Sequence, residues 1–325
     1  FGSRRAQGYD GAIYGSRAAI IGGCDSTACT ISDKYFNVPA VGTMAHSWVQ
    51  LFDNEYEAFK TWAEVYPDSC SLLIDTYNVL KSGLPNAIKV FDEILKPLGK
   101  RPTGVRIDSG DITYLTKKCR KVLDDAGYSD CQIIVSNSLD EHIITDVLNQ
   151  GACIDAFGVG ERLITAKSEP VFGGVYKLVA IEKDGKLIPK IKVSENTEKI
   201  TNPGFKKIYR IYDKISDKAI ADLISLNHEF INENEPLEIF HPIETWKRKK
   251  ITNYYVKDLM VQIFEKGNQI YSSPSVLEIK EIAKNESEFL MTQTFRLKGF
   301  KRAADLDTDD GWNFETFLKK LRRFN

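Results

Sequence analysis

Short apolar segments alternate with longer amphipathic segments along the first half of the chain. The short segments are typical of strands buried in a parallel sheet, and they are residues 38–41, 71–74, 103–105, 132–135 and 154–157. The amphipathic segments carry apolar residues at helical spacing, and they include residues 84–98, 112–126 and 140–150. Strand and helix therefore recur together about every 30 residues, which indicates successive parallel βαβ units.

Polar residues and glycines follow the predicted strands at the points where the strands end. They are Asp25, Thr43, His46, Asp75, Arg106, Asp108, Ser136, Asn137, Gly158 and Gly160. In an α/β barrel such loops all open on one face, whereas a doubly wound sheet gathers only some of them near its switch point. The pattern therefore favours an α/β barrel carrying the active site, over residues 1–174.

The pattern changes after residue 174. Apolar residues alternate with polar ones, or form short runs, in three stretches around Asp184-Gly185-Lys186: residues 175–181, 187–193 and 207–212. This pattern is typical of antiparallel hairpins. We expect a β-rich lobe over residues 175–250 and a mostly helical segment over residues 251–325. The glycine-rich residues 1–15 are predicted to form an ordered loop.

Composition narrows the class of protein. A net charge of −1 argues against a nucleic-acid or anionic-membrane partner, and no apolar run approaches the roughly 20 residues of a membrane helix. Six scattered cysteines without a C-x-x-C pair indicate reduced thiols and a cytoplasmic protein. Because the chain has neither a signal sequence nor an initiator methionine, we expect it to begin inside a longer protein.

The turn at residues 106–111 concentrates charge between a strand and a helix. Arg106, Asp108 and Asp111 lie there with Ser109 and Gly110, and Ser109 or Asp111 can cap the helix. A cation, carboxylates and free helix N–H groups suit a phosphate-and-metal ligand. The alternative is a capped turn with an internal Arg–Asp pair.

Other strand exits carry further candidate chemistry. His46 stands in a glycine- and threonine-rich loop and can act as acid, base or nucleophile, unless it is only a hydrogen-bonded structural group. Gly158 and Gly160 can present backbone N–H groups to a phosphate, or simply form a tight turn. Asp25, Asp75 and Asp108 can hold Mg²⁺ or cap helices, and capping is the preferred interpretation for Asp75. Together these groups indicate a phosphate-handling enzyme.

Six motifs occur in the same order as in nicotinate phosphoribosyltransferases, and the chain resembles that family. They are FGSRRAQG at 1–8, GGCDST at 22–27, GTMAHSW at 42–48, RIDSGD at 106–111, SNSLDE at 136–141 and FGVG at 157–160. The resemblance is specific over residues 1–181, looser to residue 250, and absent beyond residue 285.

The resemblance implies a type II phosphoribosyltransferase with an incomplete α/β barrel. Such an enzyme joins nicotinate to phosphoribosyl pyrophosphate, giving nicotinate mononucleotide and pyrophosphate in NAD salvage. Members of the family use Mg²⁺, act as homodimers, and couple the reaction to ATP hydrolysis through a phosphorylated histidine.

The resemblance also implies roles for individual residues. His46 matches the phosphorylated histidine, Arg106 and Thr43 match positions that hold the nicotinate carboxylate, and Phe1 matches an aromatic that stacks on the pyridine ring. Asp108 matches an acidic residue that lies near the ribose and the metal ion, and Asp25 is a second candidate metal ligand. Arg4 and Asp25 match residues near the pyridine ring and the phosphates. Asn137, Gly158 and Gly160 match residues that bind the phosphoribosyl group, and Ser136 is a further candidate there.

Physical chemistry agrees with these implied roles. Breaking the bond between C1 and pyrophosphate builds positive charge on ribose and negative charge on the leaving group, which carboxylates and Mg²⁺ stabilise respectively. A bidentate arginine favours nicotinate over its amide. A phosphoryl group on His46 would add a charge of about −2, which can act as a switch.

Two departures and two alternatives accompany the resemblance. Glu161 stands where many relatives have threonine, and the family's N-terminal region, including a tyrosine that the neighbouring subunit lends to the ring, is absent. We therefore expect weak or no activity from residues 1–325 alone. The alternatives are a nicotinamide phosphoribosyltransferase and a non-catalytic nucleotide-binding barrel, although a scaffold would need none of His46, Arg106 and Asp108.

Overall fold

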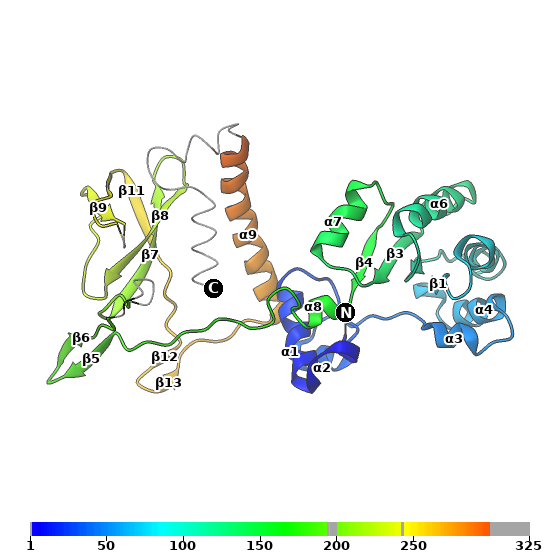
Figure 1. Ribbon diagram of the computed structural model, residues 1–325, viewed down its shortest axis with the longest axis horizontal. Coiled ribbons are helices and arrows are strands. Elements are labelled where there is room, and N and C mark those ends of the chain that lie inside the picture. Colours follow the sequence, from blue (N-terminus) through cyan, green and yellow to red (C-terminus); the bar gives the residue numbers. More distant parts are fainter. Residues whose placement is uncertain (1, 194, 196–199, 242–243, 300–325) are drawn as a thin grey trace. The chain divides into compact units, whose positions relative to one another are not determined.

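The computed structural model describes residues 2–193, 195, 200–241 and 244–299. The chain divides into two compact units (Figure 1). The first unit comprises residues up to Val171 together with Pro274–Glu288, and the second comprises Phe172–Ser273 with residues from Phe289 on.

A parallel sheet of four strands forms the centre of the first unit (Figure 1). Its strands, in spatial order, are β1 (Ser71–Leu73), β2 (Gly104–Ile107), β3 (Gln132–Asn137) and β4 (Ala156–Val159). The register pairs Leu72 with Val105, Val105 with Ile133 and Val135 with Phe157. The predicted strand–helix repeat is confirmed for the four strands from residue 71 on, whereas the strand predicted at residues 38–41 is reduced to a single β-bridge between Thr27 and Ala40. The sheet is open, and no closed barrel forms from the described strands.

Helices connect the strands and cover the sheet. They are α3 (His46–Gln50), α4 (Glu55–Val65), η2 (Pro67–Ser69), η3 (Val79–Gly83), α5 (Leu84–Val90), η4 (Phe91–Leu95), η5 (Lys96–Leu98), α6 (Ile112–Asp125) and α7 (Glu141–Asn149). Where η3 passes over the end of β1, a Cβ atom on Gly83 would overlap the carbonyl oxygen of Ile74. This close backbone approach requires glycine.

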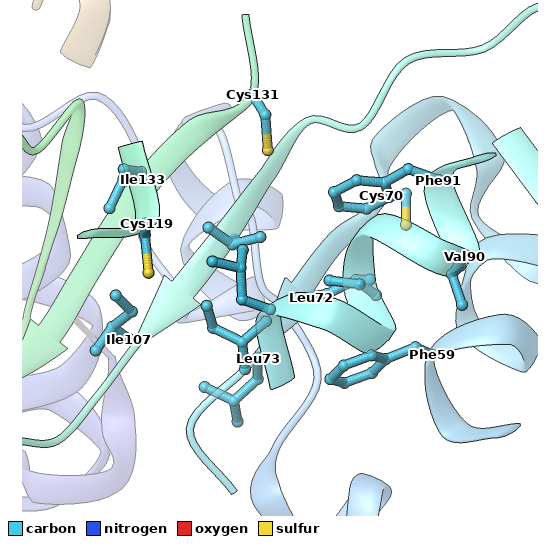
Figure 2. Packing of buried hydrophobic residues seen from close by; sticks show 14 of the residues in the cluster. Phe59, Cys70, Leu72, Leu73, Val90, Phe91, Ile107, Cys119, Cys131 and Ile133 are labelled. Atoms are coloured by element: carbon cyan, nitrogen blue, oxygen red, sulfur yellow. The ribbon is translucent and has the colours of Figure 1, made fainter. Parts of the chain in front are cut away.

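Buried apolar side chains from these strands and helices form the main core. In the view of Figure 2, Phe59 and Phe91 lie on one side of Leu72, with Ile107 and Ile133 on the other. Three cysteines complete this core, and burial raises the pKa of each thiol, at Cys70, Cys119 and Cys131, to about 12. All six cysteines are free thiols, as expected for a reduced protein.

A second layer of helices belongs to the same unit. It contains η1 (Ser3–Arg5), α1 (Gly8–Ile21), α2 (Thr30–Phe36), α8 (Glu161–Ile164) and the start of α9 (Val276–Gly299). Ile20, Val38 and Val276 form a small core there. The loop expected over residues 1–15 is therefore wrong beyond residue 7, because α1 begins at Gly8.

The second unit is antiparallel. Its strands are β5 (Ala180–Lys183), β6 (Lys186–Pro189), β7 (Lys206–Asp213), β8 (Ala219–Leu226), β9 (Leu237–Phe240), β10 (Arg248–Ile251), β11 (Tyr254–Asp258), β12 (Phe264–Glu265) and β13 (Asn268–Gln269). β5 and β6 form the expected hairpin, turning at Asp184 and Gly185, both with positive φ.

The C-terminal part differs from the helical segment that we predicted from residue 251. Tyr254–Asp258 pairs antiparallel with β7, and β12 and β13 form a hairpin before α9 begins at Val276. Among the helices of the described residues, none is both long and apolar enough to cross a membrane.

Candidate active site

Asp75, two residues after the end of β1, is the centre of a hydrogen-bonded network at the carboxyl end of the sheet. Its carboxylate is 1% exposed, and its Oδ1 lies 3.1 Å from Nε2 of His46. Its Oδ2 accepts the backbone N–H of Asp108 at 2.9 Å and the hydroxyl of Ser109 at 2.6 Å. One buried carboxylate therefore joins the loop that carries His46 to the exit of β2.

His46 is the first residue of α3, and its side chain is 38% exposed. Because an ionised carboxylate can only accept hydrogen bonds, Asp75 places the proton of a neutral imidazole on Nε2. The lone pair is then on Nδ1. The sequence predicted His46 as a reactive group, and an imidazole oriented by a buried aspartate has the arrangement that such a group needs.

Asp108 links the exits of two neighbouring strands, β2 and β3. Its Oδ1 accepts the hydroxyl of Ser136 at 2.7 Å. Within the described part of the chain, its Oδ2 accepts no hydrogen bond. Asp108 thus retains capacity for a ligand.

Arg106, in β2, is partly buried beside these acids. One N–H of its guanidinium donates to the carbonyl of Met44 at 2.9 Å, and its Nε is buried without an acceptor among the described residues. Burial lowers the pKa of Arg106, and Asp108 and Asp75 oppose that shift. The internal Arg–Asp pair considered for this turn does not form, so the guanidinium keeps donor capacity for an anion.

The exits of β3 and β4 lie side by side. Ser136 pairs with Gly158, where an added Cβ would lie 3.2 Å from that of Ser136, so glycine permits the close approach. Asn137 has a φ of +124°, and its side chain accepts the N–H of Ser138 at 2.7 Å. Gly160 precedes α8 with open space around it.

Other predicted site residues are not joined to this network by any described contact. Asp25 is fully exposed and lies 3.4 Å from Lys280 on α9. Arg4 lies exposed in η1, the Thr43 hydroxyl reaches only the carbonyl of Met44 at 3.5 Å, and Phe1 falls outside the described residues. The described residues contain no cluster of three or more His, Cys, Asp or Glu side chains that could hold a metal.

The preferred interpretation of Asp75 as a helix cap is wrong. The cap of η3 is Asn78, which accepts the N–H of Lys81 at 2.8 Å. The sequence did contain an indication that Asp75 belongs to the site, because Asp75 follows a buried strand just as Asp108 does. Asp111 does cap its helix, accepting the N–H of Tyr114 at 2.9 Å.

Comparisons with known proteins identify the family to which this chain is similar. Residues 1–224 match the nicotinate phosphoribosyltransferase (NAPRTase) family, and residues 205–299 match the nicotinate phosphoribosyltransferase C-terminal domain. The chain is 46% identical over 316 residues to a nicotinate phosphoribosyltransferase of Bacillus subtilis, covering 96% of this chain and 63% of that protein. One from Caenorhabditis elegans is 34% identical, with 86% of this chain and 59% of that protein covered.

Solved structures share the fold of this chain. The crystal structure of human nicotinic acid phosphoribosyltransferase matches with a TM-score of 0.70 at 25% identity, covering 87% of this chain and 62% of that one. A nicotinate-nucleotide pyrophosphorylase from Pyrococcus furiosus shares the fold, with a TM-score of 0.64 at 24% identity and coverage of 89% and 64%. The chain spans about three-fifths of the length of these relatives. It belongs to the nicotinate phosphoribosyltransferase family.

Proposed function

We propose that this chain carries the catalytic centre of a nicotinate phosphoribosyltransferase. The observation that carries the proposal is the network joining His46, Asp75, Asp108 and Ser136 beside the partly buried Arg106. A member of this family that had lost catalysis would have no need of these charged groups, which are costly to bury.

In the proposed reaction the pyridine nitrogen of nicotinate attacks C1 of phosphoribosyl pyrophosphate, and the bond from C1 to the pyrophosphate oxygen breaks. Asp108, with Oδ2 open, would stabilise the positive charge that develops on ribose. Arg106 would bind the nicotinate carboxylate, with Thr43 and Arg4 as further candidates and Phe1 stacking on the ring. Nicotinate mononucleotide and pyrophosphate leave.

His46 would couple ATP to this reaction. With the proton on Nε2 held by Asp75, Nδ1 has the lone pair that attacks the γ-phosphorus of ATP, and ADP leaves. The phosphoryl group would place about −2 charge beside the network. Hydrolysis of the phosphohistidine returns the free imidazole and inorganic phosphate.

The backbone of residues 137–139 and 158–160 would bind the phosphates of the substrate. Mg²⁺ is bound in such sites through one or two carboxylates together with substrate phosphates, so it does not need a protein cage. Asp108, and Asp25 as a second candidate, would hold it, and it would neutralise the leaving pyrophosphate. The family resemblance further supports an incomplete α/β barrel, a homodimer and a cytoplasmic location.

The test uses the full-length protein that contains this chain. It is incubated with nicotinate or nicotinamide, phosphoribosyl pyrophosphate, Mg²⁺ and ATP, and mononucleotide formation is measured. We expect turnover of nicotinate far above that of nicotinamide. Equal rates would contradict the assignment of nicotinate as the substrate, and no turnover would contradict the proposed function. Labelling with γ-labelled ATP should be lost in His46→Ala, and equal labelling of both proteins would exclude phosphorylation at His46.

A further inference from the structure

An ion pair links the exits of β3 and β4 beside the candidate site. Arg162 in α8, two residues after Gly160, donates to Oδ2 of Asp140, which precedes α7. The side chains of Arg162 and Asp140 are 31% and 15% exposed. The pair therefore lies largely out of solvent, where charge-assisted hydrogen bonds are stronger than at the surface.

Both oxygens of Asp140 are occupied. Oδ1 accepts the backbone N–H groups of His142 and Ile143, at 3.1 and 2.8 Å, and so caps α7. Oδ2 accepts from Arg162. Asp140 thus joins the start of α7 to α8 and is not available to bind a ligand.

The loop before Asp140 is strained. Asn137 has a φ of +124°, a region that favours glycine, and such a conformation persists only where the surroundings hold it. Asn137 ends β3, where it pairs with Val159 of β4, and outside this ladder it accepts hydrogen bonds only from the nearby N–H groups of Ser138 and Leu139 among the described residues. Beyond the end of the β3–β4 ladder, the segment is held by burial of the Leu139 side chain, which is 1% exposed, and by the Arg162–Asp140 pair.

Helix α8 is a firm anchor for this pair. A Cβ on Gly15 of α1 would lie 2.7 Å from Cδ1 of Ile164, so the two helices pack closely. The second ion pair of α8, Glu161 with Arg5 at 3.6 Å, is 50% and 60% exposed and contributes little. Arg162 is therefore the residue of α8 that connects it to the exit of β3.

We propose that Arg162 is a positioning residue that, through Asp140, holds residues 137–139 in the conformation that binds the phosphate groups of phosphoribosyl pyrophosphate. The inference rests on the proposed function. Because Arg162 acts on the loop and does not touch the reacting atoms, its loss should weaken binding of this substrate and leave the chemical step nearly unchanged.

The experiment measures kcat and both KM values of the full-length protein with Arg162→Met, Arg162→Lys, Asp140→Asn and the double variant Asp140→Asn with Arg162→Met. Asparagine caps a helix about as well as aspartate, so Asp140→Asn removes the ion pair and keeps the cap. We expect Arg162→Met and Asp140→Asn each to raise the KM for phosphoribosyl pyrophosphate about tenfold, with the KM for nicotinate unchanged. Arg162→Lys should restore part of the loss, and the double variant should be no worse than either single one.

The matched control is Arg101→Met. Arg101 pairs with Asp130 at the opposite end of the sheet, before β2 and β3 begin, and its loss should leave both KM values unchanged. A raised KM in Arg162→Met but not in Asp140→Asn would overturn the proposal, since Arg162 would then bind the substrate directly. Unchanged KM values in all variants would overturn it as well. An inactive wild-type protein would instead contradict the proposed function, and direct titration with phosphoribosyl pyrophosphate would still compare the variants.

Discussion

The two ends of the parallel sheet use the same residue types in different ways. At the amino ends of β2 and β3, Arg101 donates to Asp130 at 2.9 Å and to the carbonyl of Gly127 at 2.8 Å, and both charged side chains are about half exposed. These charges satisfy each other in solvent. At the carboxyl ends, Arg106 is partly buried with an unpartnered Nε, and Asp108 pairs with a serine hydroxyl.

The difference shows where ligand-binding capacity comes from. A charge that is paired with its opposite and exposed contributes little and needs nothing more. A charge that is buried and only partly satisfied favours a ligand that completes its hydrogen bonds. The carboxyl end of this sheet is of the second kind.

The largest effect should come from Asp75→Asn. The amide can donate to His46, so the proton would no longer be fixed on Nε2, and the bonds from Asp108 and Ser109 would weaken. We expect ATP-coupled kcat/KM to fall by about 10²–10⁴-fold, as when a general acid or base is lost. Steady-state kinetics of the full-length protein measures it.

The matched control for that variant is Asp130→Asn at the amino end, which removes a carboxylate of the same kind from an exposed pair. Its turnover should equal that of the wild type. If the two variants were equally impaired, the contrast between the ends of the sheet would be one of stability and not of catalysis.

An intermediate effect is expected from Arg106→Lys. Lysine keeps the charge but loses the planar fork that binds a carboxylate through two parallel hydrogen bonds. The KM for nicotinate should rise about tenfold or more, while turnover of nicotinamide changes little. An unchanged ratio of the two rates would show that Arg106 does not bind the acid group.

The smallest effect concerns pH and Glu55, a buried residue at the start of α4. Burial raises the pKa of this carboxyl, hydrogen bonds from Ser82 and Asn86 partly lower it, and Asp75 raises it further. A carboxyl with a raised pKa binds its proton more tightly in the folded state. The resulting stabilisation is present at low pH and is lost as the pH rises through the folded-state pKa.

Thermal unfolding at pH 4 and pH 8 tests this sign. Glutamine at position 55 stays uncharged at both pH values. The melting temperature of Glu55→Gln minus that of the wild type should therefore be higher at pH 8 than at pH 4. Glu57→Gln, at an exposed position of the same helix, should show no such change. A Glu55→Gln variant that is equally destabilised at both pH values would show that the carboxyl does not titrate in this range.

Local patterns predicted the central sheet well. β1 to β4 are short apolar runs bounded by polar turns, and because their carboxyl ends meet at one edge, the sequence predicted that Asp75, Asp108 and Ser136 lie close together. His46 follows none of these strands and is joined to them through its contact with Asp75. The hairpin of β5 and β6 followed from Asp184-Gly185, whose positive φ angles a two-residue turn requires.

Features set by distant contacts could not be predicted in this way. An aspartate that caps a helix and one that orients a histidine look alike in sequence, and only the contact of Asp75 with His46, 29 residues earlier, separates them. β11 exists through pairing with β7, which brings Tyr254 opposite Asp213. In α1, the close packing of Gly15 against Ile164 of α8 is likewise a contact between residues far apart in the sequence.

The absence of a Cβ atom at Gly83 places a further constraint on the site. Since any side chain at position 83 would collide with the Ile74 carbonyl, even alanine would push η3 away from the strand end that carries Asp75. A substitution far from any reacting group, and invisible to a search for charged or polar residues, would therefore displace the centre of the hydrogen-bonded network. In engineering this protein, position 83 should be treated as part of the active site.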